Sequence, residues 1–323
     1  MKKITILIPT YNEEEVLPAL MDALKQVTQS LEQYHFEFLF VDDGSTDETT
    51  TLLQQFHAEN SHVQYVELSR NFGKEIAMLA GFDYADGDAV IIMDADLQHP
   101  PDMIPELIHW WEEGYEDVYT VRKEKAEKNP FKRWASNAYY TILQSLTSYD
   151  VHQGAGDFRL LDRNCIEALK RIRENERNTK GMYAYIGFRK KALEYEEAER
   201  VAGETKWKFG ELLKLAIDGI TSYSTVPLRV WSVVGLIISF FSFIFLFIEL
   251  FKAIVYGSDV AGYPTLIAAI VFLGGIQLIS LGAIGEYLAR VFIETKNRPA
   301  YFVREASMEE SERLKGRDQE NEE

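Results

Sequence analysis

Two uncharged apolar stretches near the C-terminus constrain what this chain can fold into more than any other feature. They run from Val230 to Ile248 and from Val260 to Gly285, and neither contains Asp, Glu, Lys or Arg. As helices rising ~1.5 Å per residue, 19 and 26 residues span roughly 28 and 39 Å, which suits a hydrocarbon core of about 30 Å. Buried core helices are the alternative, but these are usually shorter and more interrupted. We therefore expect two transmembrane helices, about 230–251 and 262–287, forming a hairpin within residues 229–289.

Basic residues flank the outer ends of this predicted hairpin. They are Lys206, Lys208, Lys214 and Arg229 before the first span, and Arg290, Lys296, Arg298 and Arg304 after the second. The connecting loop has Lys252, which is offset by Asp259. The positive-inside rule then predicts a two-span protein of the cell membrane, with both termini and residues 1–228 on the cytoplasmic side.

The charge balance excludes one class of partner. The chain has 34 basic and 51 acidic residues, which argues against nucleic-acid binding. Eight acidic and three basic residues fall in the last segment, Glu305–Glu323. We expect residues 290–323 to form an acidic, partly disordered cytoplasmic tail.

The first 120 residues alternate between short β-rich runs and helical patterns. The predicted strands are Ile4–Pro9, Phe36–Val41, Val63–Leu68, Ala89–Met93 and Asp117–Val121. The predicted helices between them are Glu14–Gln33, Thr46–His57, Lys74–Tyr84 and Pro101–Glu113. Continuous apolar strands that alternate with helices are typical of an α/β fold with a mostly parallel sheet covered on both faces. Ligands of such sheets bind at the carboxyl ends of the strands.

Two amphipathic helical patterns follow, at about 131–147 and 208–221. Apolar residues recur every three or four positions in both, and the second pattern directly precedes the first predicted span. Either helix could pack on the sheet or lie in the membrane interface. We weigh these alternatives equally for the first helix and favour the interface for the second.

Acidic residues cluster where three of the predicted strands end. Asp94 and Asp96 follow the fourth strand, where both carboxylates could turn toward one hard divalent cation, with Gln98 as a neutral oxygen ligand. Asp-x-Asp alone is a weak signal, but its position after an apolar strand strengthens it. Three acidic strand ends that face one crevice predict a site for a nucleotide and a metal ion.

The end of the second strand reads in two ways. Ser45 or Thr46 could cap the next helix, with Asp47 near its N-terminal dipole, which is a purely structural role. Capping explains less well why two consecutive acids, Asp42 and Asp43, precede a glycine at the strand end. A carboxylate there could accept a hydrogen bond from a nucleobase or ribose. The first strand ends beside an aromatic ring and another acid, Tyr11 and Glu13.

Together these motifs resemble the family 2 glycosyltransferases of the GT-A fold. The resemblance rests on Ile8–Glu13 (IPTYNE), Val41–Ser45 (VDDGS), Asn71–Lys74 (NFGK) and Asp94–Gln98 (DADLQ). Gly156–Leu160 (GDFRL) and Arg200–Trp207 (RVAGETKW) are similar to the polyprenyl-phosphate sugar transferases, which include dolichol-phosphate mannose synthases and bacterial undecaprenyl-phosphate glycosyltransferases. The resemblance covers essentially residues 1–300, and the paired spans resemble the bacterial members.

The resemblance implies a role for each matching residue. The catalytic residues would be Asp157 and Asp96. The nucleotide sugar would be held by Pro9, Tyr11, Glu13, Asp43, Lys74, Asp94, Arg122, Arg200 and Lys206. The lipid phosphate would meet Arg133, Arg122 and Arg200, and Mg²⁺ or Mn²⁺ would bind Asp94, Asp96 and Gln98. Without the motif match, Arg122 and Arg133 read as ordinary surface charges.

The chemistry of such a transfer agrees with this composition. A leaving diphosphate must be neutralised by a metal ion and cationic side chains. A lipid phosphate is already an anionic nucleophile, so Asp157 need only orient the sugar or the acceptor. We expect inverting transfer of one sugar, glucose or N-acetylglucosamine favoured, from a UDP-linked donor to undecaprenyl phosphate.

Two other functions fit parts of the sequence. A processive polysaccharide synthase would carry a Gln-x-x-Arg-Trp motif, but Pro130 stands where the glutamine should precede Arg133 and Trp134. A non-catalytic membrane scaffold would not need Asp94, Asp96, Asp157 and Lys206 together. The sequence does not identify the sugar, the nucleotide or the choice between Mg²⁺ and Mn²⁺, and self-association through the hairpin remains open.

Overall fold

The computed structural model describes residues 1–122, 155–175, 177–195 and 262–308, together with eight separate positions between 237 and 255. The chain divides into two compact units, Met1–Lys208 with Pro299–Glu323, and Phe209–Arg298. The predicted amphipathic helices at 131–147 and 208–221 lie outside the described residues.

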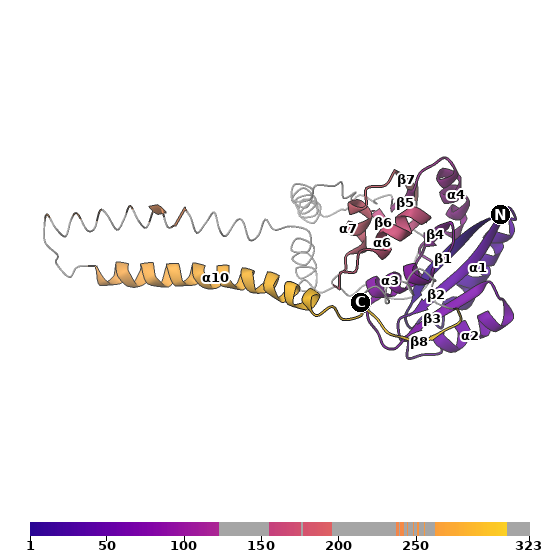
Figure 1. Cartoon of the computed structure of the whole chain (residues 1–323), viewed down its shortest axis with the longest axis horizontal. Helices are drawn as coiled ribbons and strands as arrows, with labels where there is room; N and C mark the ends of the chain where they lie inside the picture. Colours follow the sequence, from indigo (N-terminus) through magenta and orange to yellow (C-terminus); the bar gives the residue numbers. More distant parts are fainter. Residues whose placement is uncertain are drawn as a thin grey trace, which may run out of the picture. The chain divides into compact units, whose positions relative to one another are not determined.

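An eight-stranded mixed sheet forms the first unit, in the order β7-β5-β6-β4-β1-β2-β3-β8 (Figure 1). The strands are β1 Lys2–Thr10, β2 Tyr34–Asp42, β3 Val63–Leu68, β4 Ala89–Ile92, β5 Asp117–Arg122, β6 Ala155–Asp162, β7 Lys190–Tyr195 and β8 Val303–Ala306. Parallel pairing joins β1 to β2 and β4, β2 to β3, and β5 to β7, whereas β6 and β8 pair antiparallel. The predicted mostly parallel α/β sheet is confirmed, as are its five predicted strands.

Helices cover both faces of this sheet, which explains the continuous apolar strands. The described helices of this unit are α1 Leu17–Gln29, α2 Thr49–Glu59, α3 Lys74–Tyr84, η1 Pro101–Met103, α4 Ile104–Glu112, α6 Arg163–Lys170 and α7 Thr179–Tyr185. In β1, Ile6 and Ile8 pack into a core with α1 and α4, whereas Leu7 packs into a second core with α3 and α6. Burial on both faces favours continuous apolar runs over an alternation of apolar and polar residues.

The segment expected to form a partly disordered tail contains regular structure up to residue 306. In the second unit, α10 continues to Thr295, and in the first unit β8 adds an edge strand to β3. Arg304 forms an ion pair with Glu67 at 2.6 Å, and Tyr65 donates a hydrogen bond to Glu305 at 2.6 Å. Pairing with β3 thus orders four residues that look like polar coil in the sequence, and partial disorder of the tail stays a prediction. Residues 309–323 lie beyond the described part.

The second unit contains one long described helix, α10, from Tyr263 to Thr295. Within it, Phe272–Thr295 is long and apolar enough to cross a membrane by length and composition. An 18-residue window of this stretch has a mean hydropathy of 1.4, and none of that window is buried. It overlaps the predicted span at 262–287 but runs past its end. The predicted span at 230–251 falls mainly on residues that the structure does not describe.

Candidate active site

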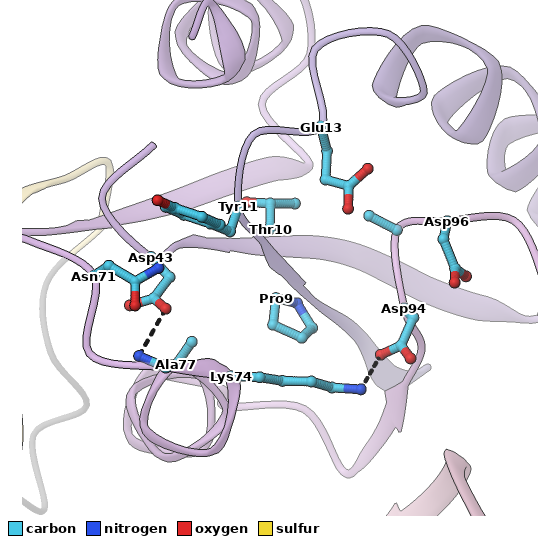
Figure 2. Close-up of a pocket in the computed structure, with 12 residues that line it drawn as sticks. Pro9, Thr10, Tyr11, Glu13, Asp43, Asn71, Lys74, Ala77, Asp94 and Asp96 are labelled. Atoms are coloured by element: carbon cyan, nitrogen blue, oxygen red, sulfur yellow. Dashed lines mark hydrogen bonds and ion pairs between the residues drawn. The ribbon is translucent and has the colours of Figure 1, made fainter. Parts of the chain in front are cut away.

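A pocket of about 300 Å³ opens at the carboxyl ends of β1, β2 and β4, beside the first turn of α3 (Figure 2). Its lining residues are Pro9, Thr10, Tyr11, Glu13, Asp43, Asn71, Gly73, Lys74, Ala77, Asp94, Ala95 and Asp96. Parallel strands bring their carboxyl ends to one edge of the sheet, so motifs far apart in the chain meet here. Seven of the residues predicted to bind nucleotide sugar or metal line this pocket: Pro9, Tyr11, Glu13, Asp43, Lys74, Asp94 and Asp96.

Asp43 anchors the loop that leads into α3. Its carboxylate accepts hydrogen bonds from the backbone N–H groups of Phe72 and Gly73, at 2.7 and 2.8 Å. Gly73 adopts a φ of 96°, a conformation that glycine tolerates best. Burial raises the pKa of Asp43, while the two backbone N–H groups oppose that rise. The residue therefore shapes the pocket as well as lining it.

Asp42 has a structural role instead. It is fully buried, and it accepts hydrogen bonds from the Ser45 backbone at 3.1 Å, the Ser45 hydroxyl at 2.5 Å and the Thr50 hydroxyl. The expected capping of α2 by Ser45 or Thr46 was wrong, because the helix begins at Thr49 and has no side-chain cap. Gly44 directly follows the two acids at a φ of 68°, and a Cβ there would sit 2.5 Å from the Arg70 carbonyl carbon. This turn therefore requires glycine.

Lys74 joins two acids from different strands. Its ammonium nitrogen lies 2.6 Å from Asp94 Oδ1, beyond the end of β4, and 2.9 Å from Asp157 Oδ2, on β6. Burial alone would lower the pKa of Lys74, but the charges of Asp94 and Asp157 raise it well above its ordinary value. Burial would raise the pKa of Asp157, but Lys74 and Lys180 lower it. Both members of the Lys74–Asp157 pair are therefore charged at neutral pH.

The backbone around Asp157 is held by a buried arginine. Arg159 donates to the Gly156 carbonyl at 2.8 Å and to both oxygens of Asp117 at 3.2 Å, and its guanidinium stacks on Tyr183 at 3.7 Å. Asp157 Oδ1 is buried and has no hydrogen-bond partner among the described residues. That oxygen can accept a hydrogen bond from a ligand.

Besides Asp43, three more carboxylates line the pocket and give it an excess of negative charge. Figure 2 shows Glu13, Asp94 and Asp96 around the same opening. Burial and the charges of Asp96, Asp47 and Asp94 raise the pKa of Glu13. Hard oxygen ligands that repel one another in this way fit a divalent cation, which would neutralise them. Among the described residues, no group of three or more His, Cys, Asp or Glu side chains could hold a metal ion by itself, so a cation here would need oxygens from a ligand.

Gln98 and His99 lie behind the pocket and not in its lining. The Gln98 backbone N–H donates to Asp96 Oδ1 at 3.1 Å, across a turn in which Leu97 has a φ of 57°. His99 Nδ1 accepts from the Asp94 backbone at 3.3 Å, its ring stacks on Phe158, and burial lowers its pKa. Neutral His99 therefore supports the Asp94–Gln98 turn.

No role was predicted for His99, Thr10 or Asn71 from the sequence. His99 follows the DADLQ motif directly, and Thr10 and Asn71 lie inside motifs already named, so proximity to those motifs was the available signal.

Of the four other basic residues predicted to bind phosphate, one has a described backbone position. Arg122 ends β5, paired in register with Tyr195 of β7, but its side chain is not described. Arg133, Arg200 and Lys206 fall in segments outside the structure's described ranges.

The fold and the pocket define an α/β protein with an acidic pocket at the carboxyl ends of its strands. Residues 5–170 match the family model for glycosyl transferase family 2. An uncharacterized glycosyltransferase of Synechocystis sp. is 44% identical over 301 residues, covering 93% of this chain and 94% of the relative. The chain therefore belongs to glycosyl transferase family 2.

Two other relatives of similar length have names that state the sugar transferred and the lipid bactoprenol. The bactoprenol glucosyl transferase of Shigella phage SfII is 38% identical over 304 residues, 94% of this chain and 98% of its own. A prophage bactoprenol glucosyl transferase homolog of Escherichia coli is 38% identical over 302 residues, with the same coverage. Among solved structures, a mannosyltransferase of Pyrobaculum calidifontis in complex with GDP-Man and Mn²⁺ aligns over 62% of this chain and 57% of its own, with 19% identity and a TM-score of 0.44.

Proposed function

We propose that this chain transfers a single sugar, glucose favoured, from a UDP-linked donor to undecaprenyl phosphate, with inversion at the sugar carbon. The structural observation behind the proposal is the ion-paired Lys74 between Asp94 and Asp157 in an acidic pocket at the strand ends. Two relatives that cover nearly the whole chain are named for glucosyl transfer involving bactoprenol, which supports the sugar and the acceptor.

In this proposal, the pocket holds the donor. Tyr11 is 44% exposed at the opening, where its ring offers a surface to a nucleobase. Asp43 still has lone pairs for a ribose or base donor after it accepts two backbone bonds. Asp94 and Asp96 would supply oxygens to Mg²⁺ or Mn²⁺, and the diphosphate would complete the coordination. Such a cation would stabilise the charge of the leaving diphosphate.

Asp157 would act on the acceptor side without serving as a strong base. Its pKa is lowered, so at neutral pH it is a carboxylate with little tendency to take a proton. A phosphate monoester is an anionic nucleophile already, so the attack needs alignment more than deprotonation. The unpartnered Asp157 Oδ1 could orient a sugar hydroxyl for that attack.

The proposed acceptor requires a membrane, and the long apolar α10 is consistent with one. We retain the prediction of two spans, with the family 2 domain and both termini in the cytoplasm, where nucleotide sugars are made. Arg122, Arg133, Arg200 and Lys206 remain proposed phosphate-binding residues, because two anions must approach each other during transfer.

One assay tests the whole proposal. Purified full-length protein is given undecaprenyl phosphate, Mn²⁺ and each of UDP-glucose, UDP-N-acetylglucosamine, GDP-mannose and UDP-galactose, and the lipid product is analysed by mass spectrometry. We expect one hexose added to the lipid, fastest with UDP-glucose. A polymeric product would indicate a processive synthase, and failure of every donor in both Mn²⁺ and Mg²⁺ would indicate a scaffold.

A further inference from the structure

Lys74 forms an ion pair with Asp94, whose carboxylate would also bind the divalent cation in the proposed donor complex. Its ammonium lies 2.6 Å from Asp94 Oδ1, and that buried oxygen has no hydrogen bond to any other described residue. Figure 2 shows the lysine reaching along the pocket from the start of α3 to Asp94. Without a ligand, this ion pair compensates part of the negative charge of the pocket.

Two cations cannot both approach the same carboxylate closely without repelling each other. The closely coordinated oxygens of a divalent cation lie about 2.0–2.6 Å from it, so an ion on Asp94 would sit near the ammonium. The ammonium of Lys74 must therefore move away from Asp94 or keep the ion out.

A diphosphate offers the lysine another partner. The Lys74 side chain is 42% exposed, and its four-carbon stem has several rotatable bonds. The residue begins an 11-residue helix, whose N-terminus favours anions, and its neighbours Gly73 and Ala77 line the same pocket. The ammonium can therefore exchange a carboxylate for a phosphate oxygen without leaving the pocket.

We propose that Lys74 is an internal counter-cation, which competes with the divalent cation for Asp94 and is released to the diphosphate of the donor. The inference rests on the proposed function, since it assumes that metal and diphosphate share this pocket. Each of the two ligands then favours the other through the same lysine. By thermodynamic linkage, the divalent cation and the diphosphate must raise each other's affinity by the same factor. Couplings of this kind are typically about 5–150-fold.

The test measures each ligand alone with the full-length protein in detergent. Mn²⁺ affinity is measured by electron paramagnetic resonance without nucleotide, and UDP affinity by calorimetry in EDTA. We expect Lys74→Gln to bind Mn²⁺ at least about fivefold more tightly, because the ammonium that competes for Asp94 is gone. We expect the same variant to bind UDP at least about fivefold more weakly, because the ammonium that would pair with the diphosphate is gone. If Lys74 had only a structural role, the substitution would weaken the binding of both Mn²⁺ and UDP.

Two control variants separate this exchange from general charge effects. Lys180 acts on Asp157 through its charge, and no ion pair joins it to Asp94 among the described contacts, so Lys180→Gln should change each affinity less than about twofold. Lys74→Arg keeps the charge and should retain wild-type Mn²⁺ affinity. Lys74→Ala replaces the glutamine variant if thermal unfolding reveals a folding defect.

The outcomes distinguish failure of this inference from failure of the proposed function. If the wild type binds Mn²⁺ and UDP but Lys74→Gln binds Mn²⁺ no tighter, the inference is wrong and the donor pocket stands. The same holds if Lys74→Arg binds Mn²⁺ as tightly as Lys74→Gln. If the wild type binds neither ligand, both the inference and the proposed function are wrong.

Discussion

Two strand ends in this protein carry a pair of acids, and the two pairs have different partners. At the end of β2, Asp42 accepts hydrogen bonds from Ser45 and Thr50, and Asp43 accepts two from the backbone that leads into α3. At the end of β4, Asp94 has its ion pair with Lys74, and Asp96 accepts one backbone bond from Gln98.

The difference separates acids that build the fold from acids that remain available to a ligand. A buried carboxylate must be compensated, and the β2 pair is compensated by hydrogen bonds from the protein itself. The β4 pair has fewer such bonds and lines the pocket with Glu13, so part of its compensation can come from a bound cation. Asp43 belongs to both groups, since it lines the pocket while fixing its wall.

Asp96→Asn should give the largest effect if this comparison is right. The amide keeps the shape and can still accept the Gln98 bond, but it removes the negative charge that a cation needs. We expect turnover in saturating Mn²⁺ to fall by about 100-fold or more, a loss typical of removing transition-state charge stabilisation. Steady-state kinetics and thermal unfolding should be measured together, with an unchanged Tm as the control. Near-normal turnover would remove the metal-binding role from Asp96.

Asp42→Ala should affect stability more than catalysis. The substitution leaves the Ser45 N–H and the Thr50 hydroxyl without their acceptor, which costs about 1–3 kcal/mol of unfolding free energy. For a domain of this size, each kcal/mol lowers Tm by about 2–4 °C. Thermal unfolding should detect this shift, while kcat per folded molecule changes much less than in Asp96→Asn. A variant with wild-type Tm and no activity would contradict the division between the two strand ends.

The sequence predicts strands with a continuous apolar run better than strands that contain charged residues. β1, β2 and β4 are buried on both faces, so their apolar runs identify them without knowledge of the partner strands. Three strands were not predicted, because charged residues interrupt each of them: β6 (AGDFRLLD), β7 (KKALEY) and β8 (VREA). Their strand conformation depends on pairing with β4, β5 and β3, and pairing between distant segments is not visible in a local pattern.

The same limit applies to the site. Strand-end motifs predicted the residues of the pocket, because parallel topology brings carboxyl ends together. The sequence did not indicate that Lys74 would pair with Asp157, 83 positions away, or that Asp42 and Asp43 would divide into structural and ligand-facing roles. Those outcomes depend on which donors the folded backbone presents to each carboxylate.

Glu13→Gln should give the smallest effect, and it tests whether the pocket carries uncompensated charge. The pKa of Glu13 is raised above its ordinary value of 4.5 by burial and by Asp96, Asp47 and Asp94. Between its unfolded and folded pKa values the native state binds more protons, so unfolding free energy falls as pH rises through that window. The wild type should therefore lose stability relative to Glu13→Gln as pH rises above about 4.5, and the two should converge below it.

Because Glu13 is partly exposed, we expect a gain in Tm of no more than about 2 °C for the variant at neutral pH. Thermal unfolding of both proteins in EDTA from pH 4 to pH 8 checks this, and a variant less stable than the wild type at pH 7 would show that Glu13 is compensated by the protein, like Asp42.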